Sequence, residues 1–306
     1  MSRLIPAALA LCLFVLPALA QAPDTSLTPE EAEAVYRAYT DEILADVTPG
    51  RGTVSLERAP VMLTVTDAFD FYSASETRTI LEDLWSNPPD DTVLGMVFPA
   101  GLSPVDAPWG AVFTYEETGY VTDDDAASTD YAQLLREMQH NTTQANKDRI
   151  EQGFEEVHLV GWAVPPSYDS ESHRLIWAKD LLFADAGGIH TLNYDMRLLG
   201  RRGVLSINLI GAMDALSEVR AAGPEVLALA SFNPGATYAD YVEGDKTAGY
   251  GVAALIAGGA GAAVLKKTGL LAVVLIFLKK AWILIPIVFA GAWRFVRGLF
   301  GGGAKS

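Results

Sequence analysis

The sequence predicts an α+β protein, in which an antiparallel sheet meander packs against helices and a C-terminal transmembrane helix segment follows. The first observation is a series of four strand-like stretches between Val157 and Ile210 that only short turns separate, as in an antiparallel meander. The second is that helical patterns precede and follow these strands and do not alternate with them, which is typical of α+β folds. The third is a long apolar region after Lys246.

Residues 1–20 have the features of a secretory signal peptide. Arg3 gives a positive start, Leu4–Leu16 is apolar, and Ala18-Leu19-Ala20 forms a small-residue cleavage site. An uncleaved anchor is the alternative, but the apolar stretch is shorter than the roughly 20 residues that span a bilayer. We therefore expect a mature chain that begins at Gln21 and lies outside the cytoplasm.

Acidic residues dominate the middle of the chain. All 38 Asp and Glu lie between Gln21 and Lys246, where only 14 of the 22 Lys and Arg fall, so this region has a net charge of −24. A body this acidic repels phosphate backbones, which argues against nucleic acid as a partner and leaves solubility as the simplest role of the charge.

Three helices are expected before the main strands. Ser73 and Glu76 have the spacing of a capping box, which marks the start of the second helix. The third helix is clear as far as His140, and helical spacing continues beyond it. The three predicted helices span Thr28–Asp46, Ser75–Trp85 and Tyr131–Ile150.

Strand patterns fill most of the remaining chain. Pro165–Asp169 is expected to be a turn, and Gly187-Gly188 predicts a hairpin. Asp214–Ala222 predicts a helix, and a separate helix is expected after Pro224. The predicted strands are Thr53–Leu56, Val61–Val65, Val93–Phe98, Ala111–Glu116, Val157–Ala163, His173–Phe183, Ile189–Leu199 and Val204–Ile210.

Residues 247–300 are predicted to anchor the protein in a membrane. Ala248–Leu265 has no charge, and two lysine pairs alone interrupt the apolar runs that follow, which lysine stems can tolerate near the ends of a span. One crossing is favoured because the basic residues that follow it favour the cytoplasm, and a helical hairpin is the alternative. Ala254, Gly258 and Ala262 repeat every four residues and predict either close helix packing in the membrane or ordinary anchor composition.

Motifs that would identify a catalytic centre are absent from the sequence. There is no G-x-S-x-G, H-E-x-x-H, Walker A or G-x-G-x-x-G pattern, and the only cysteine, Cys12, lies in the signal segment. Asp123–Asp125 with Asp130 does not fit a calcium loop, so we expect a solvated loop that caps the next helix. The histidines lack the ligand spacing of a zinc site; they are His140, His158, His173 and His190. No catalytic residue, metal site or cofactor is therefore predicted.

One face of a predicted strand carries polar side chains that are candidates for ligand binding. Asn193, Asp195 and Arg197 alternate with four apolar residues, which period two places in the core: Leu192, Tyr194, Met196 and Leu198. The whole candidate binding face comprises Trp162, Tyr168, Asp169, Trp177, Asn193, Asp195 and Arg197. The alternative is a structural salt-bridge network of Asp180, Asp195 and Arg197.

Several stretches, taken in order, resemble one bacterial family. They are Gly119–Ala126, Asn146, Arg149, Gly161–Ala163, Pro166, Tyr168-Asp169, Leu175–Ala178, Leu192–Arg201, Tyr238–Asp240, Asp245-Lys246 and Tyr250-Gly251. They are similar to the membrane-anchored family called domain of unknown function 2167 (DUF2167). The resemblance implies a signal, an extracytoplasmic domain and a C-terminal anchor, and it supplies no established activity. Some members carry a label as regulators of a secreted glucan-debranching enzyme.

These features together predict a non-enzymatic protein of the cytoplasmic membrane, with its main domain, residues 21–246, on the periplasmic side. The expected role is to bind an envelope protein or another envelope component, or a second copy through the C-terminal helix. One alternative is a hydrolase or lyase for envelope or glucan substrates that uses carboxylates with His173 or Tyr168. Another is an accessory subunit of a membrane complex.

Overall fold

The computed structural model describes residues 29–257, except 86, 88, 152–155, 185–187 and 189. The predicted signal peptide, residues 1–20, lies outside the described residues, as does the predicted anchor from residue 258 onward. Within the described part of the chain, no helix is both long and apolar enough to cross a membrane.

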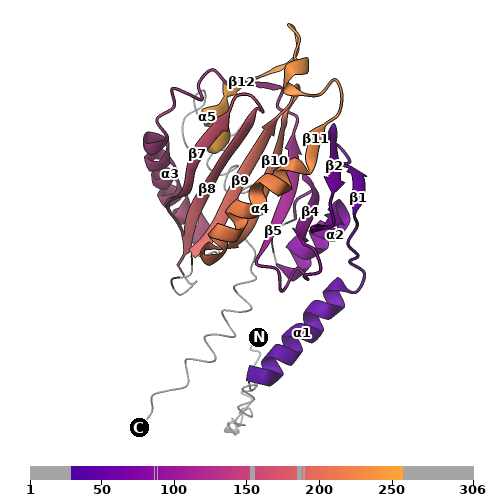
Figure 1. The fold of residues 1–306 in the computed structure, drawn as a ribbon. Coiled ribbons are helices and arrows are strands. Elements are labelled where there is room, and N and C mark those ends of the chain that lie inside the picture. Colours follow the sequence, from indigo (N-terminus) through magenta and orange to yellow (C-terminus); the bar gives the residue numbers. More distant parts are fainter. Residues whose placement is uncertain are drawn as a thin grey trace, which may run out of the picture.

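An antiparallel seven-stranded sheet forms the centre of the α+β fold (Figure 1). Its strand order is β3-β4-β5-β10-β9-β8-β7, so β7 to β10 form the predicted meander and β3 to β5 form a second one. The strands span Phe69–Ser73 (β3), Val93–Pro99 (β4), Trp109–Glu116 (β5), Val157–Asp169 (β7), Arg174–Phe183 (β8), His190–Leu199 (β9) and Val204–Ala212 (β10).

The front face of this sheet, as seen in Figure 1, carries helix α4 (Leu216–Ala228) and part of the main core. Gly223 brings α4 close to the sheet, because a Cβ there would lie 3.2 Å from the Tyr194 ring. The four residues predicted to be core, Leu192, Tyr194, Met196 and Leu198, are all buried in this cluster. A three-stranded sheet packs into the same core; it consists of β1 (Gly52–Ser55), β2 (Val61–Val65) and β11 (Ala230–Phe232).

The opposite face of the sheet is covered in two places. Over the β7 side lie α3 (Tyr131–Glu151), α5 (Val252–Ala257) and the parallel pair β6 (Tyr120–Thr122) and β12 (Thr247–Gly251). Over the β3 side lies α2 (Ala74–Arg78), which continues as the π-helical turn Thr79–Leu84. The expected capping box is present, because the Ser73 and Glu76 side chains each accept from the other residue's backbone N–H.

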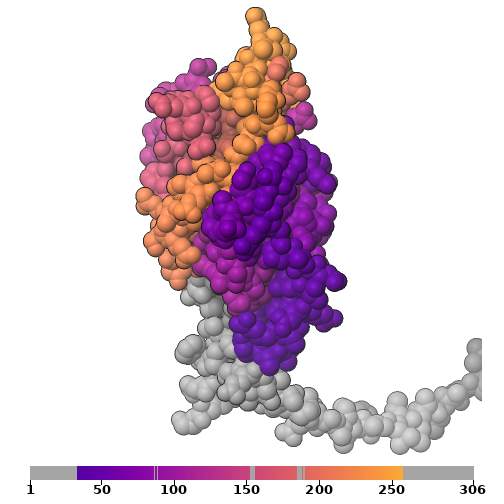
Figure 2. Space-filling view, turned by 45° about the vertical axis from the view of Figure 1, so that its right-hand side comes forward, coloured from indigo at the N-terminus to yellow at the C-terminus, as the bar shows by residue number. Residues whose placement is uncertain are grey.

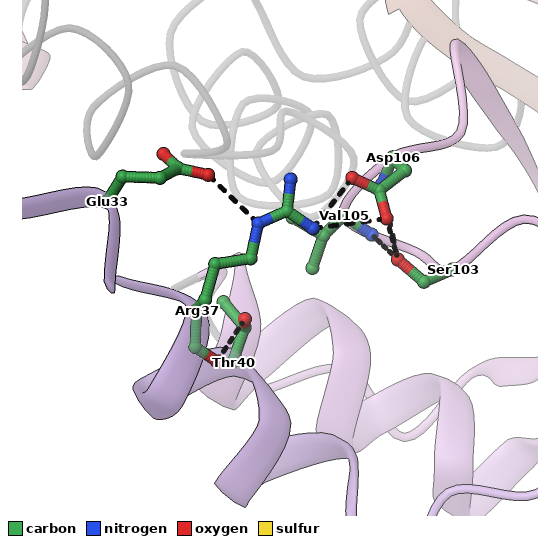
Figure 3. A network of polar contacts seen from close by, with 6 residues as sticks. All are labelled: Glu33, Arg37, Thr40, Ser103, Val105 and Asp106. Atoms are coloured by element: carbon green, nitrogen blue, oxygen red, sulfur yellow. Dashed lines mark hydrogen bonds and ion pairs between the residues drawn. The ribbon is translucent and has the colours of Figure 1, made fainter. Parts of the chain in front are cut away.

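Helix α1 (Pro29–Leu44) extends from the lower end of the domain (Figures 1 and 2). The Arg37 guanidinium links it to the β4–β5 loop, at 2.9 Å from Glu33 of its own helix and 3.0 Å from Asp106 of the loop. The Ser103 hydroxyl donates to Asp106 and holds this carboxylate in place (Figure 3).

Two expectations about prolines are wrong. Pro165–Asp169 is not a turn but part of β7, where bulges between Trp162 and Ser167 accommodate the prolines on an edge strand. Pro224 does not separate two helices, since α4 continues through it. The Pro224 ring is exposed, so it does not obstruct the buried face of the helix, where the side chains of Val226 and Leu227 pack on the core.

Candidate functional site

The candidate binding face is only partly assembled as expected. Six of its seven residues belong to the sheet face that lies opposite α4, whereas Asp169 begins the exposed turn between β7 and β8. The six divide into a central group in the middle of the sheet, which is buried except for the partly buried Arg197, and a group toward β7. Trp177, Asn193, Asp195 and Arg197 form the first group, and Trp162 and Tyr168 form the second.

Three members of the central group belong to what we call the polar band, and Trp177 lies beside it. The band consists of Lys179, Asn193, Asp195, Arg197 and Asn208. Cross-strand pairing sets Trp177 of β8, Asp195 of β9 and Asn208 of β10 side by side, and it sets Lys179 beside Asn193 in the next row. Asp195 is the centre of the band. Its carboxylate lies 3.0 Å from the Lys179 ammonium and 3.2 Å from the Arg197 guanidinium, and it accepts a 2.9 Å hydrogen bond from Asn208.

Charge pairing keeps Asp195 ionised in this buried position. Burial alone would raise the pKa of its carboxyl group, but the nearby Lys179 and Arg197 charges and the hydrogen bonds from Lys179 and Asn208 outweigh burial and lower it. The Arg197 guanidinium also lies 4.8 Å over the Trp177 ring, and it donates to the Met196 carbonyl. These contacts fix Arg197 firmly beside the carboxylate.

The alternative salt-bridge network is present only in part. Asp195 and Arg197 do pair, as that alternative requires. Asp180 is not a member, because it lies on the other face of β8 by alternation and pairs with His190 at 2.6 Å. The network instead includes Lys179, which pairs with Asp195 and is the second cation beside Arg197.

A second constellation lies at the turn between β7 and β8. The Tyr168 hydroxyl donates to Asp123 Oδ2 at 2.8 Å and lies 3.2 Å from His173 Nδ1. The single proton of the Tyr168 hydroxyl points to the carboxylate, so this hydroxyl can only accept a hydrogen bond from His173. The Nδ1 atom of His173 therefore carries a proton, and in a neutral ring its Nε2 atom is an acceptor. His173 also has a left-handed backbone, with φ of 52°, which is uncommon for a residue with a Cβ.

Three tyrosines extend this constellation into a stack of rings. Tyr238 stacks on His173 at 4.0 Å between ring centroids, Tyr120 stacks on Tyr238 at 4.4 Å, and Tyr241 stacks on Tyr120 at 4.0 Å. We call these four rings the aromatic row. Its members come from the β7–β8 turn, from β6 and from the segment after β11, and all except Tyr238 are partly exposed.

The Tyr168 and Tyr238 phenols stay protonated at neutral pH. Burial raises the pKa of Tyr168, and the hydrogen bond to Asp123 and the charge of that carboxylate raise it further. Burial likewise raises the pKa of Tyr238, whose hydroxyl donates to the Val121 carbonyl at 2.9 Å. Tyr168 is therefore a hydrogen-bond donor here and not a base or a nucleophile.

The acidic loop uses its carboxylates for structure. Asp130 accepts from the backbone N–H groups of Ala132 and Gln133 and so caps α3, as expected. Asp125 accepts from the N–H groups of Val252 and Ala253 and so caps α5. Over the described residues there is no group of three or more His, Cys, Asp or Glu that could hold a metal ion.

Comparison with known proteins identifies the family. A profile of the family described as protein of unknown function (DUF2167) matches residues 48–290. The chain belongs to this family. A search of curated proteins gives no match. Among solved structures, the DUF2167 chain is similar to cyanobacterial PsbP (CyanoP) from Synechocystis sp. PCC 6803, with a TM-score of 0.35 and 8% identity over 59% of this chain and 91% of that one.

The sequence pointed to some of these residues and missed others. Tyr168 and His173 were both named, but nothing in their spacing linked them to Asp123, which lies 45 residues before Tyr168. Tyr238 and Tyr241 have the spacing of one helical turn, and this was the signal available for the aromatic row. Of the proposed membrane packing face, Ala254 lies in α5, and Gly258 and Ala262 are outside the described residues.

Proposed function

We propose that this DUF2167 protein is a membrane-anchored extracytoplasmic module, and that it binds a partner protein through the aromatic row. The observation that carries the proposal is the row itself: four rings from three separate segments, in which consecutive ring centroids lie 4.0–4.4 Å apart and every ring except Tyr238 is partly exposed. Tyrosine is enriched in protein interfaces because its ring buries a large area and its hydroxyl still forms hydrogen bonds.

The charge around the row favours a basic partner surface. Asp123 lies beside His173, at 3.7 Å, and the surrounding domain carries the net charge of −24 counted for residues 21–246. Cationic side chains bind to aromatic faces and are drawn to an acidic surface from a distance. A partner that presents Arg or Lys fits both properties of this end of the molecule.

The proposed location rests on the two ends of the sequence. The signal-like residues 1–20 and the apolar residues 247–300 together support an exported domain that stays at the cytoplasmic membrane. A reporter that is active only after export, fused after Asp240, should be active. A well-expressed but inactive fusion would refute the location.

Site-specific crosslinking tests the binding surface. We would replace Tyr241, at the outer end of the row, with a photo-crosslinking amino acid in the full chain and irradiate intact cells. Tyr39 of α1 is the matched control, because it is an exposed tyrosine on a different part of the domain. The proposal expects one discrete crosslinked protein from position 241 and none of that size from position 39. The same product from both positions, or no product from 241, would contradict it.

A hydrolase or lyase is the second candidate, and one specific observation favours it. Asp123 and Tyr168 orient His173 with its Nε2 as an acceptor, which is the arrangement of a general base. In this reading Tyr168 and Asp123 are positioning residues. Hydrolysis of purified envelope glycans by the full chain, abolished by His173→Gln and retained in His158→Gln, would favour the enzyme. Absence of such activity would leave the binding role.

A further inference from the structure

Besides Asp195 Oδ2, which lies 3.0 Å from the Lys179 ammonium, three polar atoms in and beside the polar band are buried without a hydrogen-bond partner among the described residues. They are Asn193 Nδ2, Asn208 Oδ1 and Trp177 Nε1, and their residues are only 5%, 4% and 1% exposed. Most buried polar groups in proteins are paired, because an unpaired one loses its water without compensation. Three such atoms in adjacent positions therefore require an explanation.

These atoms lie next to one another on the sheet. Trp177 and Asn208 flank Asp195 on the two neighbouring strands, and Asn193 is two residues from Asp195 on the same strand and the same face. The orientation of the Asn208 amide is fixed, since its NH₂ group must face the Asp195 carboxylate and its oxygen then points away. For Asn193 either amide orientation leaves a polar atom buried.

The band also has one positive charge more than it can neutralise itself. Lys179 and Arg197 both pair with Asp195, and neither has another carboxylate within ion-pair distance among the described residues. The Lys179 ammonium has three N–H donors, of which Asp195 uses one. Their side chains are 23% and 17% exposed, so the band connects to solvent at these two residues.

We propose that the polar band is a binding site for a small carboxylate that also carries a hydrogen-bond donor, such as a hydroxy acid or an amino acid. The carboxylate balances the surplus charge and accepts hydrogen bonds from Lys179, Asn193 and Trp177. The donor group of the ligand satisfies Asn208 Oδ1. This site is separate from the aromatic row, and it does not depend on the partner-binding role proposed above.

Ligand-induced stabilisation of the full chain in detergent tests this site. The probes are L-lactate, L-malate, L-alanine and L-glutamate, each compared with the derivative in which every carboxylate is a primary amide. A bound carboxylate should raise the Tm by about 5 °C or more once its concentration exceeds the Kd by about 100-fold. The amide should have little effect, because it lacks the charge that Lys179 recognises. If none of the carboxylates raises the Tm by more than its amide does, the proposal is overturned.

Asn193→Leu separates a binding role from a structural one. Because the buried Asn193 amide nitrogen has no partner among the described residues, the variant should keep its Tm in the absence of ligand and lose the shift caused by the carboxylate. Asn141→Leu on α3 is the control and should retain that shift. A large drop in Tm without ligand would mean that ordered water or another internal group already satisfies Asn193. That result, or a full shift in Asn193→Leu, would refute the site.

Discussion

Asp195 shows how a single buried residue can link stability to pH. Its folded-state pKa lies below the ordinary value of 3.8, so the ionised form contributes stability above that value. This contribution is lost as the pH falls from the ordinary pKa through the lowered folded pKa. As the pH falls, the unfolded chain binds this proton before the folded chain does, so acid lowers the stability of the folded state.

Asp195→Asn should therefore destabilise the protein at neutral pH and not at low pH. We expect a loss of about 2–3 kcal/mol at pH 7, below the usual cost of breaking a buried pair, because Lys179 and Arg197 retain some contact with water. The difference from the parent should shrink as the pH falls below 3.8. Urea unfolding of the full chain in detergent, followed from pH 7 to pH 3, measures both.

The control for this prediction is Asp124→Asn. Asp124 is an exposed aspartate in the acidic loop and lies away from the polar band. Its substitution should leave the unfolding free energy within about 0.5 kcal/mol of the parent at every pH. A pH-independent loss in Asp195→Asn would show that the ion pairs do not control the stability of the band.

The sequence predicted half of this arrangement at the residue scale. Alternation alone placed Asn193, Asp195 and Arg197 on one face, because a strand has no other periodicity. It did not select Lys179 or Asn208 as partners, since cross-strand register is set by turns and packing that one strand does not encode. Asp180 was therefore assigned to the network in place of Lys179.

At the scale of elements, a carboxylate from one loop holds the start of a distant helix. Asp125 accepts from Val252 and Ala253 at 2.8 and 3.1 Å and anchors α5 to the acidic loop. Asp125→Ala should destabilise the protein by about 1 kcal/mol and speed amide exchange in the peptide that covers β12 and α5. Asp124→Ala is the matched control. Equal exchange in the two variants would show that α5 needs no cap.

Helix α4 gives a prediction with the opposite sign. Pro224 lacks the N–H that would donate to the Arg220 carbonyl, and its exposed ring contributes little packing. Pro224→Ala should stabilise the protein by about 1 kcal/mol, because the restored hydrogen bond outweighs the added freedom of the unfolded chain. Chemical denaturation measures the change. Glu225→Ala, the neighbouring exposed position, should change stability by less than half as much.

Prolines account for the main errors in the predicted elements. Local preference places Pro165 and Pro166 in a turn, but an edge strand with bulges tolerates them because their missing N–H groups have no obligatory partner there. By contrast, the capping box at Ser73 predicted the start of α2 correctly, since the interacting groups lie within three residues. Signals that are complete within one turn were reliable, and those that depend on neighbouring strands were not.

At the scale of the whole molecule, the described domain extends beyond the composition change at Lys246. Strand β12 pairs with β6, and α5 buries Val252, Leu255 and Ile256 in the same cluster as Trp177. By composition these residues group with the predicted apolar anchor, because a buried core helix and a membrane segment have the same composition over so short a stretch.

Two truncated chains test how much of the apolar region the domain requires. Both begin at Gln21, and they end after Lys246 or after Ala257. Burial of an aliphatic side chain contributes about 1.5–3 kcal/mol, so the three core residues of α5 should contribute about 5 kcal/mol or more. The longer chain should unfold cooperatively, with a midpoint well above that of the shorter one. Since 5 kcal/mol is comparable to the whole stability of many domains, the shorter chain should be largely unfolded at 25 °C.

Leu255→Ala in the longer chain should cost about 2–4 kcal/mol by itself. Equal urea midpoints for the two chains would mean that α5 packs on the domain without stabilising it.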